Sequence, residues 1–348
     1  MNPNLYNKIP KTIQRPLAAF MVAAISIGFS SHFVTAQEAA PFPDVEEGNE
    51  YFVAVSFLKD AGLIEGYEDG TFKPYQDINR AEALKVLLGA FPEEGMAEME
   101  PASPDPELFP DVLSSDWFYA YVMEAKEDGL VEGYPDGLFH PERTINKAES
   151  LKIALIREGG FIPEEATAMP YTDVPTTEWY APYAEVSKNR TIFLENRSDG
   201  SLNADELMTR GEFVKMIYRI IKTADGSTFA RATWYGKAGV NWGTASGEKF
   251  DYMAMTAAHK ELPFGTVIRV TNVANGKQVD VKINDRGPYP TGLDLDLTTG
   301  AFEEIASLGT GVIMTEYEIL EDPTAEASEE EQEDPIEEEL PPEYGFYS

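Results

Sequence analysis

Four ionisable residues in the C-terminal half of the chain have side chains that can carry general acid–base chemistry: Glu248, Asp251, His259 and Asp285. All four fall in segments rich in turn-forming residues, and loops on a rigid framework commonly carry catalytic groups. A carboxyl group kept protonated by its surroundings can act as a general acid, and a histidine can orient or relay a proton. Each residue also has a structural explanation. Asp285 could cap the turn before Gly287, the two other acids could be a solvated pair, and a single histidine could be structural.

The elements that must position these residues are β-strands within residues 228–320. Apolar residues alternate with polar ones in 267–273 and 278–283, and an Asn-Gly hairpin signal separates the two runs. A helical pattern follows at 299–308, and a last strand is expected at 311–319. Short strands, tight turns and one short helix predict a small closed β-barrel.

Four motifs in this module resemble the rare lipoprotein A (RlpA-like) family. They are Tyr235-Gly236 after Trp234, the Thr-Ala-Ser-Gly-Glu segment ending at Glu248, the Ala-Ala-His segment ending at His259, and Asn-Asp-Arg-Gly-Pro around Asp285. The resemblance implies an all-β, six-stranded double-psi β-barrel over residues 228–320. It also implies a lytic transglycosylase that cleaves MurNAc–GlcNAc bonds, preferably in peptidoglycan strands without stem peptides, and leaves 1,6-anhydro-MurNAc ends. Glu248, Asp251, His259 and Asp285 match the family's functional positions.

In such a reaction one group serves first as acid and then as base, because the sugar's own C6 hydroxyl replaces water as the attacking group. We expect Asp285 to be this group, partly protonated, and His259 to orient it or to relay the proton. Glu248 and Asp251 would hold sugar hydroxyls or tune the acid. Substrate contacts are expected from Trp242, Tyr235 and Arg286, with Trp234 as a further candidate. Trp234 could instead pack in the barrel, and Arg286 could bind a lactyl carboxylate or brace the turn.

Two departures from the family pattern bear on this site. The chain has no cysteine, and therefore no thioether-linked lipid anchor, although many relatives are lipoproteins. The segment 293–298 keeps the Asp-Leu-Thr end of a family motif but places Leu293 and Asp294 where other residues are more usual. The alternative to an enzyme is an expansin-like peptidoglycan-binding or wall-loosening module that does not cut. A passive barrel in a surface-layer protein is a third reading.

The N-terminal half contains three repeats, at 41–100, 107–160 and 169–223, and each carries two landmarks at a nearly constant separation. The first landmark contains an aspartate: Asp44, Asp111 and Asp173. The second contains a basic residue: Arg80, Lys147 and Arg210. The basic residue follows a predicted helix N-cap (Asn79, Asn146 or Thr209), and a glutamate three residues after the cap completes a capping box. An earlier helix in each repeat is predicted from apolar spacing such as that of Trp117, Tyr121 and Ala125.

These repeats resemble the S-layer homology family over about residues 41–221. The resemblance implies an all-α, three-fold pseudo-symmetric prism that binds secondary cell-wall polysaccharide. In that family the basic residues and the opening aspartates contribute to the ligand grooves. A wall polymer with pyruvyl or phosphate groups is anionic, and arginine binds such groups in a bidentate fork. The alternative is that the basic residues are helix-surface charges and the aspartates are caps.

Composition and the chain ends set further limits. The net charge of −34 argues against nucleic-acid binding. The chain has three histidines, so neither a metal site nor any other cofactor is expected. Residues 1–36 have the positive and apolar regions of a secretory signal, although a single membrane anchor is an alternative. The protein is thus expected to be secreted to the cell wall or cell surface, or to the periplasm if an outer membrane is present. Residues 321–348 are predicted to be a disordered acidic tail.

Overall fold

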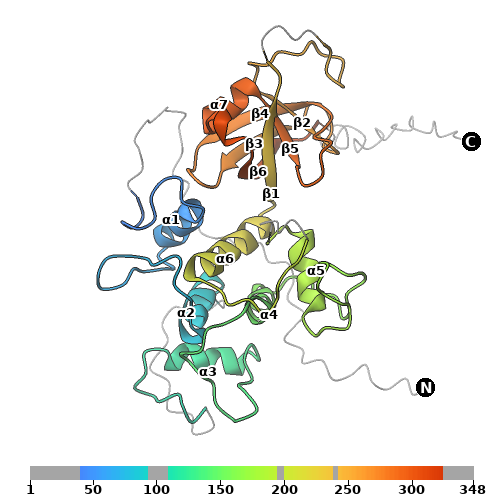
Figure 1. Cartoon of the computed structure of the whole chain (residues 1–348). Helices are drawn as coiled ribbons and strands as arrows, with labels where there is room; N and C mark the ends of the chain where they lie inside the picture. Colours follow the sequence, from blue (N-terminus) through green and yellow to red (C-terminus); the bar gives the residue numbers. More distant parts are fainter. Residues whose placement is uncertain (1–39, 93–108, 194–199, 238–241, 324–348) are drawn as a thin grey trace, which may run out of the picture. The chain divides into compact units, whose positions relative to one another are not determined.

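The computed structural model describes residues 40–92, 109–193, 200–237 and 242–323. Within these ranges the chain forms two compact units, which are described separately (Figure 1). The first contains most of residues 54–220, and the second contains most of residues 221–323. The predicted signal at 1–36 and nearly all of the predicted tail at 321–348 lie outside the described residues.

The first unit is helical, and its helices follow the sequence repeats in pairs. They are α1 (Phe52–Asp60), α2 (Arg80–Ala90), α3 (Tyr119–Glu127), α4 (Lys147–Glu158), α5 (Ala181–Asn189) and α6 (Arg210–Ala224). The expectation that Trp117 belongs to the first helix of its repeat is wrong. The helix begins at Tyr119, and the Trp117 ring is about half exposed and packs edge-on against Phe118.

The second helix of each repeat begins where the capping boxes predict. Asn79 and Asn146 each accept a backbone N–H from the glutamate three residues later, and that glutamate accepts from the cap's own N–H. Thr209 and Glu212 exchange the same pair of bonds, at 3.2 and 2.9 Å. Each cap uses up backbone donors that would otherwise lack partners at a helix start. The basic residue of each repeat is therefore the first residue of its helix.

Backbone hydrogen bonds join the three repeats in a closed cycle. The N–H of Ile78 donates to the carbonyl of Met208 (2.9 Å), Met208 donates to Ile145 (2.9 Å), and Ile145 donates to Ile78 (3.3 Å). The side chains of all three residues are buried. Repeat 1 thus contacts repeat 3 as directly as it contacts repeat 2.

The second unit is a six-stranded β structure. Its strands are β1 (Thr228–Tyr235), β2 (Thr256–His259), β3 (Val267–Asn272), β4 (Gln278–Asp285), β5 (Leu295–Thr298) and β6 (Ile313–Glu321). The strands pair in the order β1-β5-β2-β4-β3-β6, and β6 pairs back onto β1, which closes the sheet. The pairs β1–β5 and β2–β4 are parallel, and the other pairs are antiparallel. Helix α7 (Thr299–Ile305) packs against β4 and β5.

The β prediction is confirmed, but two candidate residues lie elsewhere than expected. His259 ends β2, and Asp285 ends β4, so both are strand residues and not loop residues. Strand β4 runs two residues beyond the predicted 278–283, and α7 ends three residues before the predicted 308. The double-psi topology and the three-fold prism stay predictions.

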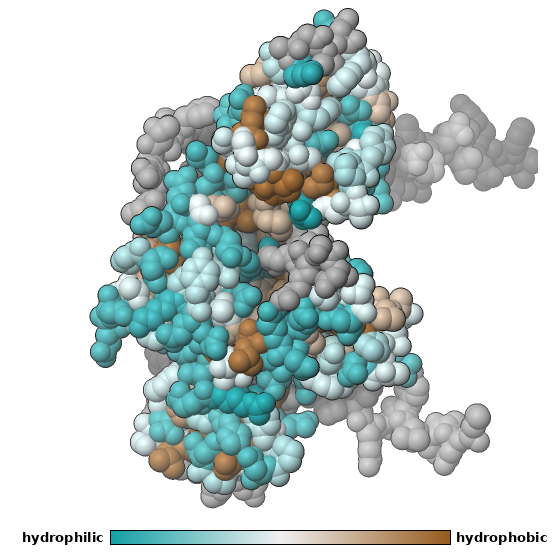
Figure 2. Space-filling model, in the orientation of Figure 1, coloured by the Kyte–Doolittle hydropathy of each residue, from teal (hydrophilic) through white to brown (hydrophobic). Residues whose placement is uncertain are grey.

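The surface of the helical unit is mainly hydrophilic on the face visible in Figure 2, with scattered exposed apolar side chains. None of the helices in the described residues combines the length and the apolar composition needed to cross a bilayer.

Candidate functional site

Two carboxyl groups flank one small residue in the wall of the barrel. Strand β2 lies between β5 and β4, and Ala258 pairs with Asp296 on one side and with Asp285 on the other. A shift in the β2–β4 register just before Ala258 places Asp285 at this position. Leu295 and Leu297 are fully buried in the core, so Asp296 points to the opposite face of β5. Three neighbouring strands therefore bring two acids together across an alanine.

Asp296 is the acid whose surroundings favour the protonated form. Burial raises the pKa of Asp296 from 3.8 to about 6, and the negative charge of Asp285 raises it further in the same direction. The Oδ1 atom of Asp296 is buried and has no hydrogen-bond partner among the described residues. A carboxyl group with this pKa is available as a proton donor in mildly acidic solution. Sequence analysis missed Asp296 as a site residue, although it read the segment that contains it.

Asp285 has the opposite environment. Its Oδ1 accepts the backbone N–H of Ala245 (2.9 Å) and of Arg286 (2.8 Å), and its Oδ2 accepts the hydroxyl of Tyr235 (3.3 Å). Three donors directed at one carboxylate fix its position. Burial raises the pKa of Tyr235, followed by the charge of Asp285, so this phenol stays a donor at neutral pH.

An aromatic row leads away from these acids. The rings of Tyr235 and Phe250 lie 5.2 Å apart between centroids, and those of Phe250 and Trp242 lie 5.3 Å apart. Phe250 is buried, whereas Trp242 is half exposed. A side chain at Gly236 would meet the Phe250 ring at 2.4 Å, so glycine is needed for this packing. The row exposes the Trp242 ring at its outer end, and Phe250 is a member that sequence analysis missed.

Glu248 and Asp251 lie apart from the acid pair. The Glu248 carboxylate accepts from Lys282 Nζ (2.7 Å) and from Asn284 Nδ2 (2.9 Å), and these bonds lower its pKa. The exposed Asp251 accepts the N–H of Met253 (2.9 Å) within its own turn. Neither carboxylate contacts Asp285 in the structure, and both are tied to other partners.

His259 points away from the acids because its neighbour Ala258 faces them, and consecutive strand residues alternate sides. Its Nδ1 accepts the backbone N–H of Leu262 (2.9 Å), and its Nε2 lies 3.5 Å from the hydroxyl of Tyr317. Burial lowers the pKa of His259. The imidazole does not contact Asp285 in the structure. The expected direct proton relay between His259 and Asp285 is therefore not supported by a contact.

Two further candidates brace the framework. The guanidinium of Arg286 stacks on the ring of Phe264 at 3.7 Å and donates to the carbonyl of His259 at 3.3 Å, which fits the turn-bracing alternative. Trp234 donates through Nε1 to the carbonyl of Leu308 (3.1 Å) and packs against the core, which fits the packing alternative.

In the helical unit, the aspartate in the first landmark of each repeat accepts hydrogen bonds from backbone N–H groups. Asp111 accepts the N–H groups of Phe139 (2.9 Å) and His140 (2.7 Å), and His140 has a left-handed φ of 56°. Asp44 and Asp173 make the equivalent pairs of bonds. These carboxylates therefore hold the tight turn of each repeat, as the capping alternative proposed.

The three basic residues lie between repeats and are buried. Arg80 donates through Nε to the carbonyl of Phe139 in repeat 2 (3.0 Å), and Arg210 donates through Nε to Phe72 in repeat 1 (3.0 Å). Lys147 reaches the carbonyl of Leu202 in repeat 3 (3.4 Å). Each repeat thus extends one cation into the turn of the next, in the opposite cyclic order to the N–H donors of the Ile78, Met208 and Ile145 cycle.

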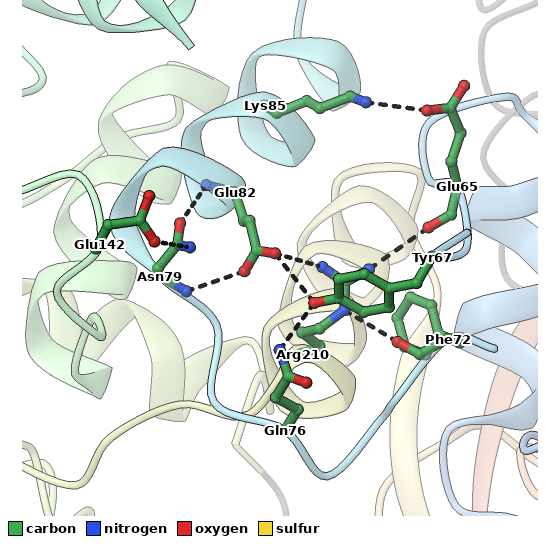
Figure 3. Close-up of polar contacts among 9 residues, drawn as sticks. All are labelled: Glu65, Tyr67, Phe72, Gln76, Asn79, Glu82, Lys85, Glu142 and Arg210. Carbon is green, nitrogen blue, oxygen red and sulfur yellow. Dashed lines mark hydrogen bonds and ion pairs between the residues drawn. The ribbon is translucent and has the colours of Figure 1, made fainter. Parts of the chain in front are cut away.

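Figure 3 shows the polar contacts around Arg210. The guanidinium packs over the Tyr67 ring at 4.6 Å and lies 3.5 Å from Glu82 Oε1. The Tyr67 hydroxyl donates to Glu82 (3.0 Å) and accepts from Gln76 Nε2 (2.9 Å). Asn79 joins the same network through the capping box. The cation, the phenol and the carboxylate are therefore mutually satisfied.

Comparisons with known proteins divide the chain between the helical unit and the β unit, as the structure does. Residues 227–317 match the family model described as lytic transglycolase, and residues 41–84 and 108–149 match the S-layer homology domain. The third repeat shares the hydrogen-bond pattern of the other two, but the S-layer homology match does not include it.

Curated relatives match each region separately. A protein of Nostoc sp. named probable endolytic peptidoglycan transglycosylase RlpA is 50% identical over 91 residues, which are 26% of this chain and 24% of that protein. The Vibrio cholerae endolytic peptidoglycan transglycosylase RlpA is 41% identical over 104 residues, which are 30% of this chain and 40% of that protein. A surface-layer 125 kDa protein of Lysinibacillus sphaericus is 26% identical over 60% of this chain and 17% of its own length. The chain thus spans well under half of each of these relatives.

Among solved structures, an expansin of Clavibacter michiganensis aligns with a TM-score of 0.24 and 24% identity, over 28% of this chain and 52% of that one. The family resemblances stated from the sequence are confirmed region by region. The chain joins S-layer homology repeats to a β domain of the lytic transglycolase family.

Proposed function

We propose that this chain is a secreted, wall-anchored endolytic peptidoglycan transglycosylase that cleaves the bond between N-acetylmuramic acid and N-acetylglucosamine. The observation that carries the proposal is the pair formed by Asp296, with its pKa near 6, and the hydrogen-bonded Asp285. Identities of 50% over 91 residues and 41% over 104 residues to two proteins named as transglycosylases support the same reaction. Strands without stem peptides are the proposed substrate, and an anhydro end is the proposed product.

In the proposed reaction, the Asp296 carboxyl gives its proton to the glycosidic oxygen, and the N-acetylglucosamine leaves with a free 4-hydroxyl. The C6 hydroxyl of the muramic acid attacks C1 and closes a 1,6-anhydro ring. Its proton passes to the Asp296 carboxylate, so the acid is regenerated and no water is consumed. The Asp285 carboxyl group, held by its three hydrogen bonds, stabilises the positive charge that develops at C1. This assignment moves the acid role expected for Asp285 to its neighbour.

The other proposed roles follow from contacts. Tyr235 holds Asp285 in place, and the row from Tyr235 to Trp242 stacks against sugar faces. His259 positions the end of β2 through its bonds to the following turn. Glu248 fixes the loop that supplies the Ala245 donor, because it binds two residues of β4. A six-stranded double-psi topology is the proposed fold of this domain.

The repeats are proposed to tether the enzyme. We infer that the three repeats form a prism that binds secondary cell-wall polysaccharide, and that the protein works at the cell wall or cell surface. The S-layer homology match and the cyclic contacts between repeats support this. Tethering raises the concentration of substrate strands around the barrel.

A digest of purified glycan strands, with and without stem peptides, tests the enzymatic proposal by mass spectrometry. We expect anhydro-muramyl products from the wild type and at least a hundredfold loss in Asp296→Asn and Asp285→Asn. Glu304→Gln, on the exposed face of α7, is the matched control and keeps full activity. Reducing-end products would instead identify a hydrolase. Strands bound without any cleavage would identify the expansin-like alternative.

A further inference from the structure

The face of the barrel that carries the acid pair also carries an arginine, one step along β1. Thr233 pairs with Asp296 in the parallel β1–β5 ladder, and the preceding pair, Ala232 and Leu295, is fully buried in the core. Because side chains alternate along a strand, Arg231 lies on the same face as Thr233 and Asp296. Two strand residues span roughly 7 Å. Arg231 is therefore placed beside the acid pair, at a distance comparable to a sugar ring with a substituent.

The backbone of Arg231 is held firmly, but its side chain is not engaged. The N–H of Arg231 donates to Asp294 Oδ2 (3.0 Å), and its carbonyl accepts the N–H of Asp294 (3.0 Å). The side chain is partly exposed, and its guanidinium has no hydrogen bond or ion pair with any residue that the structure describes. All of its N–H donors therefore remain for a ligand, on a strand whose position is fixed.

The other cations around the acid pair already have partners within the barrel. Their contacts are those of Arg286 with the Phe264 ring (3.7 Å), of Lys260 with the carbonyl of Leu293 (2.6 Å), and of Lys282 with Glu248 (2.7 Å). A cation without such contacts gains more from binding an anion, because no existing interaction is lost. Arg231 is therefore a better candidate than Arg286 for a substrate carboxylate.

Asp294 belongs to a group of charges around the end of β2. Besides burial, the charges that act on the pKa of His259 are those of Glu261, Arg286, Asp294 and Lys260. Two acids and two cations balance one another, so Arg231 leaves the neighbourhood of Asp294 with one positive charge in excess. An anionic substituent is thus favoured beside Arg231, whereas the carboxyl groups of the acid pair would repel it once they ionise.

Resting on the proposed transglycosylase function, we propose that Arg231 is a specificity-determining residue that binds the free lactyl carboxylate of muramic acid. The lactyl group is attached to C3 of the sugar whose C1 lies at the acid pair, so it projects across the ring from the bond that is cleaved. Without a stem peptide it ends in a carboxylate, which a guanidinium binds through two parallel hydrogen bonds. With a stem peptide it is an uncharged amide that offers one oxygen. Arg231 thus selects strands without stem peptides by their charge.

Three preparations of the same purified glycan strands test this with the full chain. One has free lactyl carboxylates, one has these groups converted to primary amides, and one keeps its stem peptides. From the rate of anhydro-muramyl product formation, we expect the wild type to have a kcat/KM about tenfold higher on the free than on the amidated strands.

Variants of Arg231 separate charge recognition from a structural role. Arg231→Gln should lower kcat/KM on the free strands to the value for amidated strands and leave the amidated strands unaffected. Arg231→Lys keeps the charge but not the fork, and should retain part of the preference. Lys277→Gln removes one charge from the exposed β3–β4 turn and should keep the full preference. Near-ultraviolet circular dichroism verifies the packing of each variant.

The outcomes separate this inference from the proposed function. If the wild type forms no anhydro products from any preparation, the transglycosylase proposal fails, and this inference fails with it. If the wild type cleaves free and amidated strands equally well, the reaction stands and the inference is overturned, even where stem peptides block cleavage by their size. An equal loss on both substrates in Arg231→Gln, an undiminished preference in that variant, or a lost preference in Lys277→Gln would overturn it too.

Discussion

Replacing Asp296 with asparagine should abolish cleavage and at the same time stabilise the barrel at neutral pH. The pKa of this carboxyl is 3.8 in an unfolded chain and about 6 in the fold. A raised folded-state pKa means that the group favours the fold fully below pH 3.8 and loses this contribution as pH rises through about 6. Asparagine imitates the protonated carboxyl and never ionises, so it keeps the favourable state at every pH.

The expected gain in stability of Asp296→Asn can be worked out from the change in the pKa of Asp296 on folding. One pKa unit corresponds to about 1.36 kcal/mol, so a shift of about two units gives an upper limit near 3 kcal/mol well above pH 6. Asp296 is only partly buried, and solvent screening reduces this to about 2 kcal/mol at pH 7.5. At pH 4 the same arithmetic leaves about 0.5 kcal/mol.

Hydrogen exchange followed by mass spectrometry suits this test, because peptides from β4 and β5 report on the barrel alone. Protection of these peptides should rise about thirtyfold in Asp296→Asn at pH 7.5, as expected for about 2 kcal/mol, and hardly change at pH 4. Comparing variant with wild type at the same pH cancels the intrinsic pH dependence of exchange. Equal protection at pH 7.5, or a loss of protection at both pH values, would refute the reasoning that burial and Asp285 strain the ionised form.

Three further changes test other parts of the structure. Trp242→Ala removes the exposed end of the aromatic row, so KM should rise about tenfold with kcat within threefold; a fall in kcat alone would place the ring in the chemical step. Asp111→Ala leaves two backbone N–H groups at the left-handed His140 turn without their acceptor, and thermal unfolding of the repeats should show a loss of about 2 kcal/mol. Gly236→Ala places a methyl group 2.4 Å from Phe250 at a positive φ, so it should cost the barrel about 2–4 kcal/mol, and unchanged urea unfolding would contradict this.

Asp285 could be found from the sequence because a distinctive Asn-Asp-Arg-Gly-Pro segment surrounds it. Asp296 could not, because an acid that alternates with buried leucines has the pattern of an ordinary exposed strand position. Its role depends on β2 lying between β5 and β4, and β2 and β5 have four residues each, which is too few for a periodic signal. Which short strands pair with one another is decided in the folded chain, and the local sequence of each strand does not indicate its partners.

The repeats show the same division between local and non-local information. The capping boxes are local, and the sequence predicted all three, at Asn79, Asn146 and Thr209, to the residue. The direction in which Arg80 and Arg210 reach is not local, because each binds a carbonyl of another repeat. For Asp111 and its equivalents the family resemblance implied ligand contacts, with caps as the open alternative, and in the structure these carboxylates accept backbone N–H groups.

The closed cycle formed by Ile78, Met208 and Ile145 limits how this region can evolve and unfold. An open array of repeats has two ends, and it can gain or lose a repeat by adding or removing one interface. Here every repeat has two neighbours, so deleting one breaks two interfaces and leaves a donor and an acceptor without partners. Three is then a fixed number, and the repeats are expected to melt together in one transition. A truncated copy with two repeats would therefore lose the fold of the whole helical unit.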